Sequence, residues 1–395
     1  MTEDFLHFIW RQKLWDFIDA TTTNGETIVI SNIGQSNYMD GPDFLEAVVT
    51  IDDKLWNGHV EIHTKSSEWF QHGHQHDAKY KPVILHVVYE DDVPNKLDIP
   101  TLELKGKIKK YYYNNYLNLI NNTNWLPCGD GLTNFPKPKL QLWLQRLLVE
   151  RFQQKNEQLQ SILSIENQHW EHVLFIWVMR SFGYHYNADA MEQLASNIPF
   201  SLIQKTTTEE ELLALFIGMS GFPLSSIEEK QQFNHWLAKY KLQPMSSNSW
   251  INKVRPQVRP PLVFNKLAKL YVYQHQLFAH IKFCFENYLN TNELPFKNLK
   301  ELSKATKDHL WLNAFVPVLL LYATAVNNEK WIAGLWQLME KLKADKNALI
   351  QKFKDLGLQV ENAAESQSLI HLHRNYCSVK KCLNCPVGLS LVKTQ

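Results

Sequence analysis

The hydrophobic period of this chain changes from strand-like to helical after about residue 105, and that change constrains its fold more than any other feature. After an amphipathic helical stretch at 1 to about 20, short apolar runs typical of strands alternate with polar turn residues up to about residue 105. From about Lys137 onward, apolar residues recur at helical spacing, interrupted by stretches such as VRPQVRPP at 254–261. A chain of 395 residues is long enough for more than one domain. We therefore predict an α+β first part and a helical second part.

The fold class predicted in detail is α+β, a small mixed sheet with flanking helices followed by a mainly α-helical domain. We expect an α/β domain at 1–128, an all-helical domain at 129–360, and a cysteine-bearing tail at 361–395 that packs back on the first domain. The strand-like runs lie at 26–32, 46–52, 57–64, 83–90 and 99–104. Turn residues at 52–54 predict a hairpin, and the run VILHVVY, apolar on both faces, predicts a buried central strand.

The charge balance excludes a protein whose whole surface attracts nucleic acid. Lys plus Arg is 41 and Asp plus Glu is 40, so a nucleic-acid surface would have to be a local patch. Arg255 and Arg259, in the loop VRPQVRPP, are candidates for phosphate contact, although either can equally pair with a glutamate.

No membrane or secretory segment is predicted. The start, MTEDFLHFIWRQKLWDF, lacks the basic and continuously apolar regions of a secretory signal. The longest apolar run, at 315–326, is interrupted by Pro317 and is too short to span a bilayer. We expect a cytoplasmic protein with no membrane partner, and the oligomeric state stays open.

The most informative stretch is GHVEIHTKSSEW at 58–69, which follows GPDF at 41–44. Alternate side chains of a strand share a face, so one face should carry a set of ionisable groups opposite Val60 and Ile62. That set is His59, Glu61, His63 and Lys65. If 46–52 and 57–64 form a hairpin, Asp43 falls near the level of Glu61 and His63. A purely structural hairpin with a polar face is the alternative.

The pair Pro42-Asp43 and the run Glu61-Ile62-His63 resemble the motif of the PD-(D/E)XK nuclease superfamily over roughly residues 25–105. The resemblance implies a PD-(D/E)XK-like sheet and a site in which Asp43 and Glu61 hold Mg²⁺ or Mn²⁺, which activates water and neutralises phosphate charge. His63 stands where the superfamily usually has lysine, and it would tune or deprotonate the water. Lys65 would supply the missing cation if the strand bulges.

A second candidate metal site is the histidine segment WFQHGHQHDAKY at 69–80. Its alternating His72, His74 and His76, with Asp77 beside them, could ligate Zn²⁺ or Mn²⁺. A structural role or a solvated loop is the alternative. By analogy with the nuclease superfamily, His74, Gln75 or His76 would reach the Glu61 site. The lone His86 is interpreted as a hydrogen-bonded core residue unless it points at the Glu61 face.

The C-terminal spacing Cys377-x4-Cys382-x2-Cys385 is typical of a metal or cluster site. Cys128, in WLPCGD, is the best candidate for a fourth ligand, with His373 or His371 as local substitutes. Zinc and an iron–sulfur cluster are both compatible with this set. Some nucleases of the PD-(D/E)XK superfamily have a similar plan, with one distant cysteine and three at the C-terminus. Cys284, on an apolar helix face, is interpreted as a core residue.

Over nearly its full length, the chain resembles a bacterial domain-of-unknown-function family, number 2851. The resemblance is carried by GPDFLEA, VEIHTKSSEWFQHGH, SFGYHYN, ALFIGMSGF and HLHRNYCSVKKCLNCPVG, among other runs. It implies no established activity, so the functional hypothesis rests on the local motifs. We expect a metal-dependent nuclease-like phosphodiesterase acting on nucleic acid. The alternatives are a non-catalytic binding or scaffold protein with a cysteine-ligated structural metal, and a zinc hydrolase that uses the His72–His76 segment.

Overall fold

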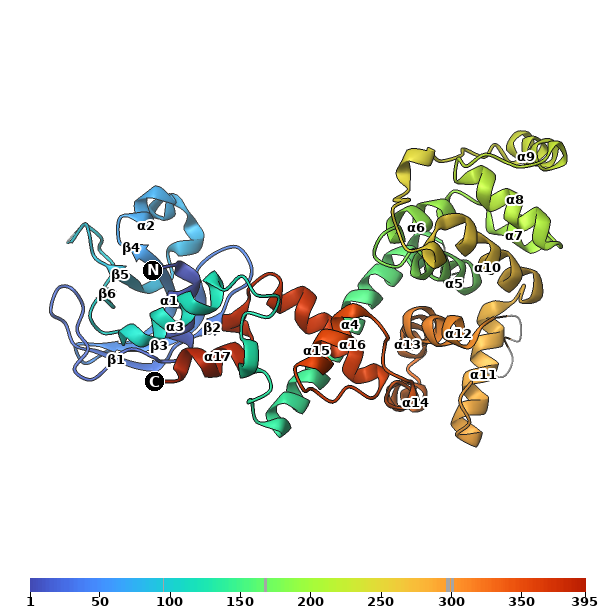
Figure 1. The fold of residues 1–395 in the computed structure, drawn as a ribbon. Coiled ribbons are helices and arrows are strands. Elements are labelled where there is room, and N and C mark those ends of the chain that lie inside the picture. The colour runs from blue at the N-terminus through green and yellow to red at the C-terminus, as the bar shows by residue number, and fades with distance from the viewer. Residues whose placement is uncertain (95, 167–168, 296–298, 300–301) are drawn as a thin grey trace. The chain divides into compact units, whose positions relative to one another are not determined.

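The chain divides into two compact units that are interleaved in sequence. The computed structural model describes residues 1–94, 96–166, 169–295, 299 and 302–395. Unit 1 comprises Met1–Leu140 and His373–Gln395, and unit 2 comprises Gln141–Leu372 (Figure 1). One boundary falls inside α4 (Lys137–Ile165), and the other directly follows α16 (Ala363–Leu372). The three C-terminal cysteines therefore belong to the same unit as the N-terminal strands.

Unit 1 is built on a mixed sheet, so the predicted α+β class is confirmed. Six strands pair among the described residues, in the order β1-β3-β4-β5-β6, with β2 also on β3. Their bounds are β1 Ile28–Asn32, β2 Gln35–Ser36, β3 Phe44–Ile51, β4 Lys54–Lys65, β5 Val83–Glu90 and β6 Thr101–Glu103. The β3–β4 pair is antiparallel and forms the predicted hairpin, whereas β4, β5 and β6 run parallel. The run VILHVVY, predicted as a buried central strand, forms β5, which is largely buried and lies between β4 and the edge strand β6.

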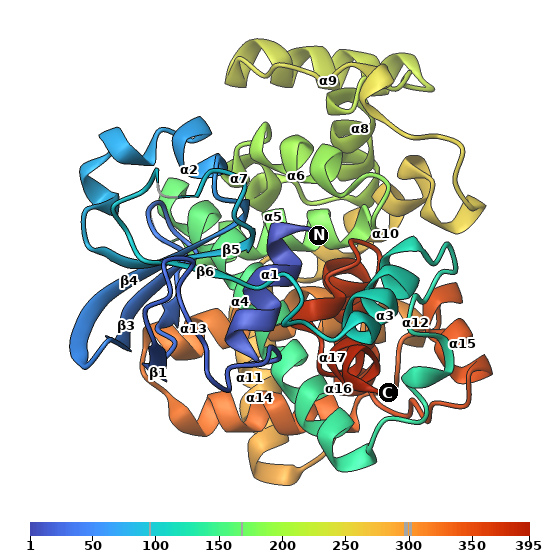
Figure 2. The same ribbon diagram turned by 90° about the vertical axis from the view of Figure 1, so that its left-hand side faces the viewer.

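One face of the sheet carries the hydrophobic core of unit 1. Helix α1 (Glu3–Arg11) contacts β4 and contributes its buried apolar face to the same cluster as Val60 and Ile62. Helices α3 (Lys110–Asn121) and α17 (Pro386–Lys393) pack against each other and add further apolar side chains to this cluster. Figure 2 shows α1 beside the strands and α3 beside α17. Because side chains alternate along β4, Glu61 and His63 face away from this core.

The opposite face is covered by the connection between β4 and β5. This segment contains α2 (Glu68–Gln71) and two 3-10 turns, η1 (His74–His76) and η2 (Ala78–Tyr80). Trp69 of α2 is buried, and its ring lies 5.4 Å from the ring of His86 on β5 and 5.3 Å from that of His74. The histidine-rich segment is therefore folded back over the strand that carries Glu61.

A bulge in β3 sets the position of Asp43. Phe44 pairs with Val60 and Ala47 with Gly58, so β3 has one more residue than β4 between these two pairs. Glu46 adopts the left-handed conformation, with φ of 59°. Gly58 is required here, because a Cβ at this position would clash with Ile84 and the carbonyl of Pro82. The bulge brings the residue before β3 beside the middle of β4.

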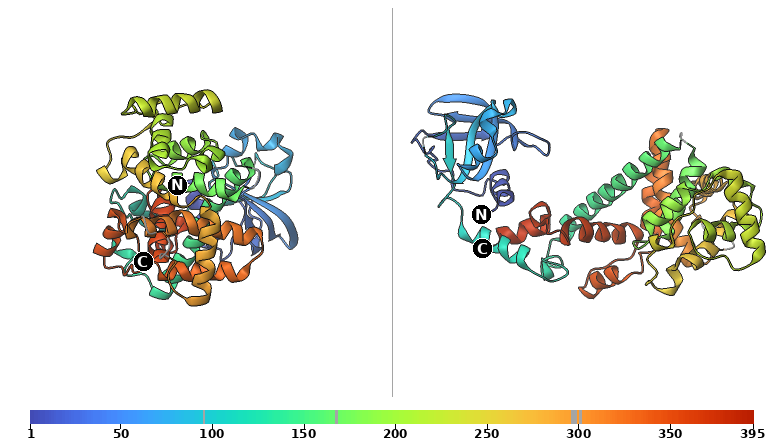
Figure 3. Two further views of the ribbon diagram at one scale, coloured as in Figure 1. Left: turned by 90° about the vertical axis from the view of Figure 1, so that its right-hand side faces the viewer. Right: turned by 90° about the horizontal axis from the view of Figure 1, so that it is seen from above.

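Unit 2 is helical throughout its named elements. Its helices after α4 have the following bounds: α5 Trp170–Phe182, α6 Ala188–Ser196, α7 Phe200–Lys205, α8 Glu209–Met219, α9 Ile227–Tyr240, α10 Pro260–Tyr273, α11 Leu277–Thr291, α12 Lys304–Leu310, α13 Val316–Ala325, α14 Glu329–Lys341, α15 Ala348–Asp355 and α16 Ala363–Leu372 (Figure 3). Short turns intervene: η4 Ser247–Ser249, η5 Pro256–Val258 and the π-helical turn η6 Trp311–Phe315. Helices α5 and α13 are apolar on nearly all sides and are buried in its core. No helix in the described part of the chain is long and apolar enough to cross a membrane.

Candidate metal centre

Asp43 and Glu61 hold each other through backbone hydrogen bonds. The backbone N–H of Asp43 donates to Glu61 Oε2 at 3.1 Å, and the N–H of Ile62 donates to Asp43 Oδ2 at 2.9 Å. The two carboxylates thus meet at the end of the β3–β4 hairpin, at the level that the sequence predicts. Glu61 is 5% exposed, so its carboxylate is almost fully removed from solvent.

Three imidazoles converge beside Glu61. One ring nitrogen from each of His63, His72 and His74 lies within 4.8 Å of the other two. His63 Nε2 is 3.2 Å from His72 Nδ1, and Glu61 Oε1 lies 3.6 Å from His63 Nε2 and 3.3 Å from His74 Nε2. His74 Nε2 is buried and makes no hydrogen bond, although it lies within ion-pair distance of the Glu61 carboxylate. The separations of 3.2–3.6 Å are those of atoms that surround one metal ion at about 2.0–2.2 Å.

The rings are supported from behind. His63 Nδ1 lies 2.8 Å from Nε2 of His86, which is fully buried on β5 directly opposite Glu61 in the register. The ring of Tyr80 stacks on that of His74 with centroids 3.7 Å apart. His86 is therefore a hydrogen-bonded core residue that also points at the Glu61 face. The two interpretations that the sequence left open for His86 are thus both correct.

Burial shifts the protonation of these groups away from their charged forms. Desolvation, with the charge of Asp43 adding to it, raises the pKa of Glu61 to about 9. Desolvation and the neighbouring imidazoles lower the pKa of His63 to about 3, and burial lowers that of His86 to about 3. The pKa of His74 is lowered by burial and by His72. Neutral imidazoles are the form that binds a metal, so the three rings could ligate a cation, whereas Glu61 would have to lose its proton to do so.

Helix α1 adds two polar residues that the sequence analysis missed. His7 Nε2 lies 3.1 Å from Asp43 Oδ2, and this carboxylate raises the pKa of His7 although burial opposes the charged form. Glu3, one turn earlier, has a raised pKa because of burial and the charge of Asp43. The signal available was a glutamate and a histidine four residues apart, which share one side of a helix. That spacing does not reveal which strand the helix packs against.

The remaining candidates lie outside this cluster or at its margin. The side chain of Lys65 is exposed, and its backbone N–H donates to Glu68 Oε2. His59 accepts a hydrogen bond from the N–H of Glu46 in the bulge, at 3.3 Å. Gln75 and His76 are exposed, and Asp77 caps the η2 turn. Arg255 and Arg259 flank η5 in unit 2, and their contact with phosphate stays a prediction.

The candidate cysteines gather elsewhere in unit 1. Cys128 precedes η3 (Gly129–Gly131), Cys377 ends η7 (His373–Cys377), Cys382 begins η8 (Cys382–Asn384), and Cys385 caps α17. Of the two local substitutes, His371 belongs to unit 2 and lies 3.5 Å from Glu150, whereas the ring of His373 lies 5.9 Å from that of Trp125 in unit 1. Cys284 is on α11 and is buried in the hydrophobic core of unit 2, as predicted.

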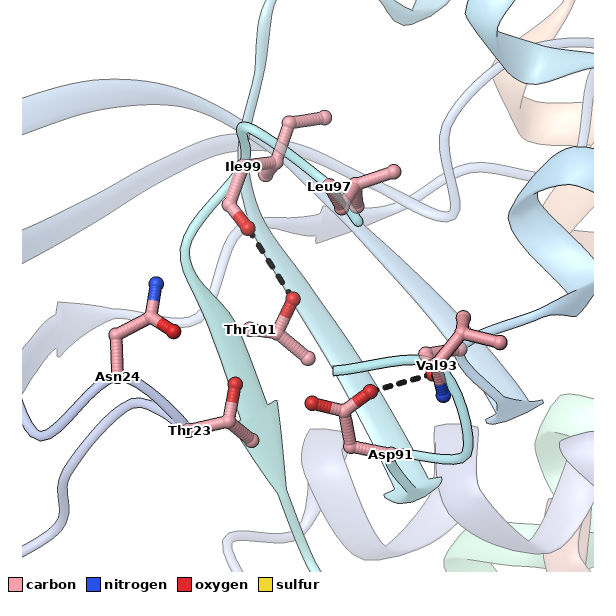
Figure 4. Close-up of a pocket in the computed structure, with 8 residues that line it drawn as sticks. Thr23, Asn24, Asp91, Val93, Leu97, Ile99 and Thr101 are labelled. Atoms are coloured by element: carbon pink, nitrogen blue, oxygen red, sulfur yellow. Dashed lines mark hydrogen bonds between the residues drawn. The ribbon is translucent and has the colours of Figure 1, made fainter. Parts of the chain in front are cut away.

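A small pocket at the β6 edge is not a substrate site. It is lined by Thr23, Asn24, Ser66, Asp91, Val93, Leu97, Ile99 and Thr101 (Figure 4). Its cavity volume of about 10 Å³ is room for about one water molecule. The hydroxyl of Thr101 donates to the carbonyl of Ile99 at 3.1 Å, so part of its polar lining is already satisfied.

The sequence model of a protein family of unknown function, DUF2851, matches residues 3–348. The chain belongs to the DUF2851 family. The match includes His7, Asp43 and the whole histidine segment, and it ends before the three C-terminal cysteines of this DUF2851 member. No curated protein and no solved structure matches the chain. The resemblance to PD-(D/E)XK nucleases stays a prediction.

Proposed function

We propose that this protein is a metal-dependent hydrolase whose ion is held by His63, His72 and His74, with the Glu61 side chain beside it. The observation that carries the proposal is the convergence of three imidazole nitrogens within 4.8 Å of one another beside a buried carboxylate. Three imidazole ligands favour Zn²⁺ or Mn²⁺ over Mg²⁺, which prefers oxygen ligands, and three protein ligands leave a position for water. Such an ion supplies an activated water and polarises the group under attack.

The histidines of the site differ in exposure and in the role that each can have. His63 and His74 lie deepest and hold their nitrogens in fixed positions, whereas His72 is exposed and marks the side from which a substrate approaches. His7 is half-buried, and its raised pKa keeps more of it as imidazolium at neutral pH. It is therefore suited to bind an anionic substrate or to protonate a leaving group, with Asp43 orienting its ring.

The second candidate function is cleavage of nucleic-acid phosphodiesters with Mg²⁺ or Mn²⁺ between Asp43 and Glu61. The observation that favours it is the mutual contact of these two residues across the hairpin. In this version His63 acts on the water and the histidine segment tunes the site. Lys65 would need to turn inward from its exposed position to act as the cation.

The test is a panel of hydrolysis assays on the purified full-length chain loaded with Zn²⁺, Mn²⁺ or Mg²⁺. The substrates are nitrophenyl phosphate monoesters, diesters and carboxylic esters, with labelled single- and double-stranded DNA and RNA. We expect metal-dependent turnover that His74→Ala and Glu61→Gln abolish. Glu46→Gln is the matched control, because it makes the same change at an exposed carboxylate on the neighbouring strand.

The outcomes separate the candidates. Turnover of nucleic acid that depends on Asp43 and Glu61 but survives His72→Ala supports the nuclease-like version. Turnover lost in both His72→Ala and His74→Ala supports the imidazole-ligated hydrolase. Tight metal binding with no turnover of any substrate would leave the non-catalytic binding or scaffold protein as the better description.

A further inference from the structure

Four cysteines from the two ends of the sequence lie on elements that pack together in unit 1. Helix α17 contacts both η3, which Cys128 precedes, and η8, which Cys382 begins. Turn η7, which ends at Cys377, contacts η8, and Cys385 links η8 to α17. Four of the five cysteines in the chain thus lie on or beside neighbouring elements, although about 250 residues separate Cys128 from Cys377.

These thiols are largely removed from solvent. The exposed fractions are 9% for Cys377, 7% for Cys382 and 8% for Cys385, and Cys128 is half-buried. Cys382 belongs to the hydrophobic core of the unit, and Cys128 packs against that core. Cys128, Cys377 and Cys382 carry free thiols. A single buried cysteine behaves as an ordinary small apolar residue. Apolar packing alone does not explain why four cysteines lie on neighbouring elements.

The thiols influence one another electrostatically. Burial raises the pKa of Cys377, and the other three cysteines raise it further. Burial raises the pKa of Cys128 to about 12, with Cys385 and Cys382 adding to the shift. Electrostatic effects of this kind arise between groups that lie near one another, and a bound metal would deprotonate the coordinating thiols outright. Lys380, which lowers the pKa of Cys382, provides nearby positive charge.

We propose that Cys128, Cys377, Cys382 and Cys385 hold a thiophilic metal centre that fastens the segment 373–395 to the rest of unit 1. The ligand chemistry is that of four thiolates, which suits one zinc ion or an iron–sulfur cluster. The centre is structural rather than catalytic, and it is independent of the hydrolase proposed for the histidine cluster.

The contacts around the cysteines fit a fastening role. The side-chain amide of Asn115 on α3 donates to the carbonyls of Leu391, Val392 and Thr394, at 3.3, 3.3 and 2.7 Å. Gly388 lies so close to the backbone of Cys382 that a Cβ there would overlap its carbonyl. The turn between Cys382 and Cys385 therefore packs directly against α17, and a metal bound at this turn would hold the helix in its position on α3.

The experiment is metal analysis of the full-length chain purified without oxygen, in a His72→Ala/His74→Ala background that removes the candidate histidine ligands. We expect about one zinc per chain, or about four iron with matching acid-labile sulfide and visible absorption. Cys377→Ser and Cys382→Ser should lose this metal. Cys284→Ser is the matched control, because it removes a buried thiol from the core of unit 2, and it should keep the metal.

Two further readouts cover variants that fail to fold. Titration of the metal-free chain with Co²⁺ should give thiolate-to-metal charge-transfer absorption, which imidazole ligands do not produce. Metal removal should also increase hydrogen exchange in α17 while that of α10 in unit 2 stays unchanged. The proposal is overturned if the chain takes up neither zinc nor iron, or if Cys377→Ser and Cys382→Ser keep the same metal content and spectrum. Loss of hydrolysis alone bears only on the histidine cluster.

Discussion

His63 Nδ1 lies 2.8 Å from His86 Nε2, between two neighbouring parallel strands and out of contact with solvent. One nitrogen of such a pair must carry the proton and the other must accept it. If Nε2 of His63 binds a metal, its proton is on Nδ1, and His86 is the acceptor. His86 is then a positioning residue that sets the tautomer and the ring angle of a ligand.

Replacing His86 with leucine should weaken zinc binding at the histidine cluster by about 10–100-fold, the usual effect of losing such a partner. The variant keeps the volume of a buried side chain but leaves the N–H of His63 without an acceptor. Affinity is measured by competition with a chromophoric chelator in a Cys377→Ser background. His86→Asn, which retains an acceptor, should restore part of the affinity.

The matched control for this prediction is His59→Asn. His59 is on the same strand as His63, but its ring binds the N–H of Glu46 in the bulge. Its replacement should leave zinc affinity within about twofold, a change of less than 0.5 kcal/mol. Equal losses in His59→Asn and His86→Leu would show that general loosening of the sheet, rather than the tautomer, controls binding.

The metal-free sheet should lose stability as the pH falls below about 6.5. Burial holds the pKa of His63 and of His86 at about 3 in the folded protein, against an ordinary 6.5. Between these pH values His63 and His86 bind protons in the unfolded chain but not in the folded chain, so a lower pH favours unfolding. Each such histidine contributes a slope of about 1.4 kcal/mol per pH unit, and the two together exceed the opposite slope of Glu61, whose raised pKa favours the folded state as the pH falls toward 4.5.

Hydrogen exchange of β5 amides at several pH values measures that slope, because it reports the opening of unit 1 alone. His86→Leu should reduce the slope by about 1.4 kcal/mol per pH unit between about pH 4 and 6. His235→Gln, which replaces an exposed histidine in unit 2, should not change it. A slope that is unaltered in His86→Leu would mean that His86 is already protonated in the folded sheet.

Asp43→Asn should lower the pKa of Glu61 in the metal-free protein. Burial is the larger cause of the value of about 9, and the negative charge of Asp43 adds to it. An asparagine keeps a carbonyl oxygen for the N–H of Ile62 but removes the charge. Carboxyl-carbon NMR of glutamate-labelled protein follows the titration. The control Asp40→Asn removes an exposed carboxylate that pairs with Lys79, and it should leave the Glu61 pKa unchanged.

Gly388→Ala should loosen α17, because the new methyl group overlaps the backbone of Cys382. We expect a loss of about 1–3 kcal/mol in the stability of the docked segment, the usual cost of overpacking. Limited proteolysis should then cut near Lys380 or Lys381 faster than in wild type. Ser390→Ala, on the same helix, only removes a bond to the carbonyl of Val387 and should leave the cleavage rate unchanged.

The sequence predicted the strands well because each carries its own period and turn residues. The hairpin at 52–54, the central VILHVVY strand and the closeness of Asp43 to Glu61 all follow from alternation and one short turn. The bulge at Glu46 is harder to anticipate, since its left-handed residue is not a glycine. It still brings Asp43 to the expected level.

The rest of the cluster depends on packing that no local pattern encodes. Helical spacing puts Glu3 and His7 on one side of α1, but it does not say that this side meets Asp43. Likewise, the alternation of His72, His74 and His76 gives no reason for the first two to turn toward His63 while the third stays exposed. The 3-10 turns of the β4–β5 connection and the ring of Trp69 decide that outcome.

Because unit 1 takes α17 from beyond the whole of unit 2, it cannot be completed during the first stage of synthesis. When the strands and α3 have left the ribosome, α17 has not yet been synthesised, because Gln141–Leu372 must be translated before it. Until then, Tyr116 and Leu119 lack the α17 side chains that pack in the same core cluster. Folding of unit 1 is thus completed late in synthesis, after unit 2 has had time to fold.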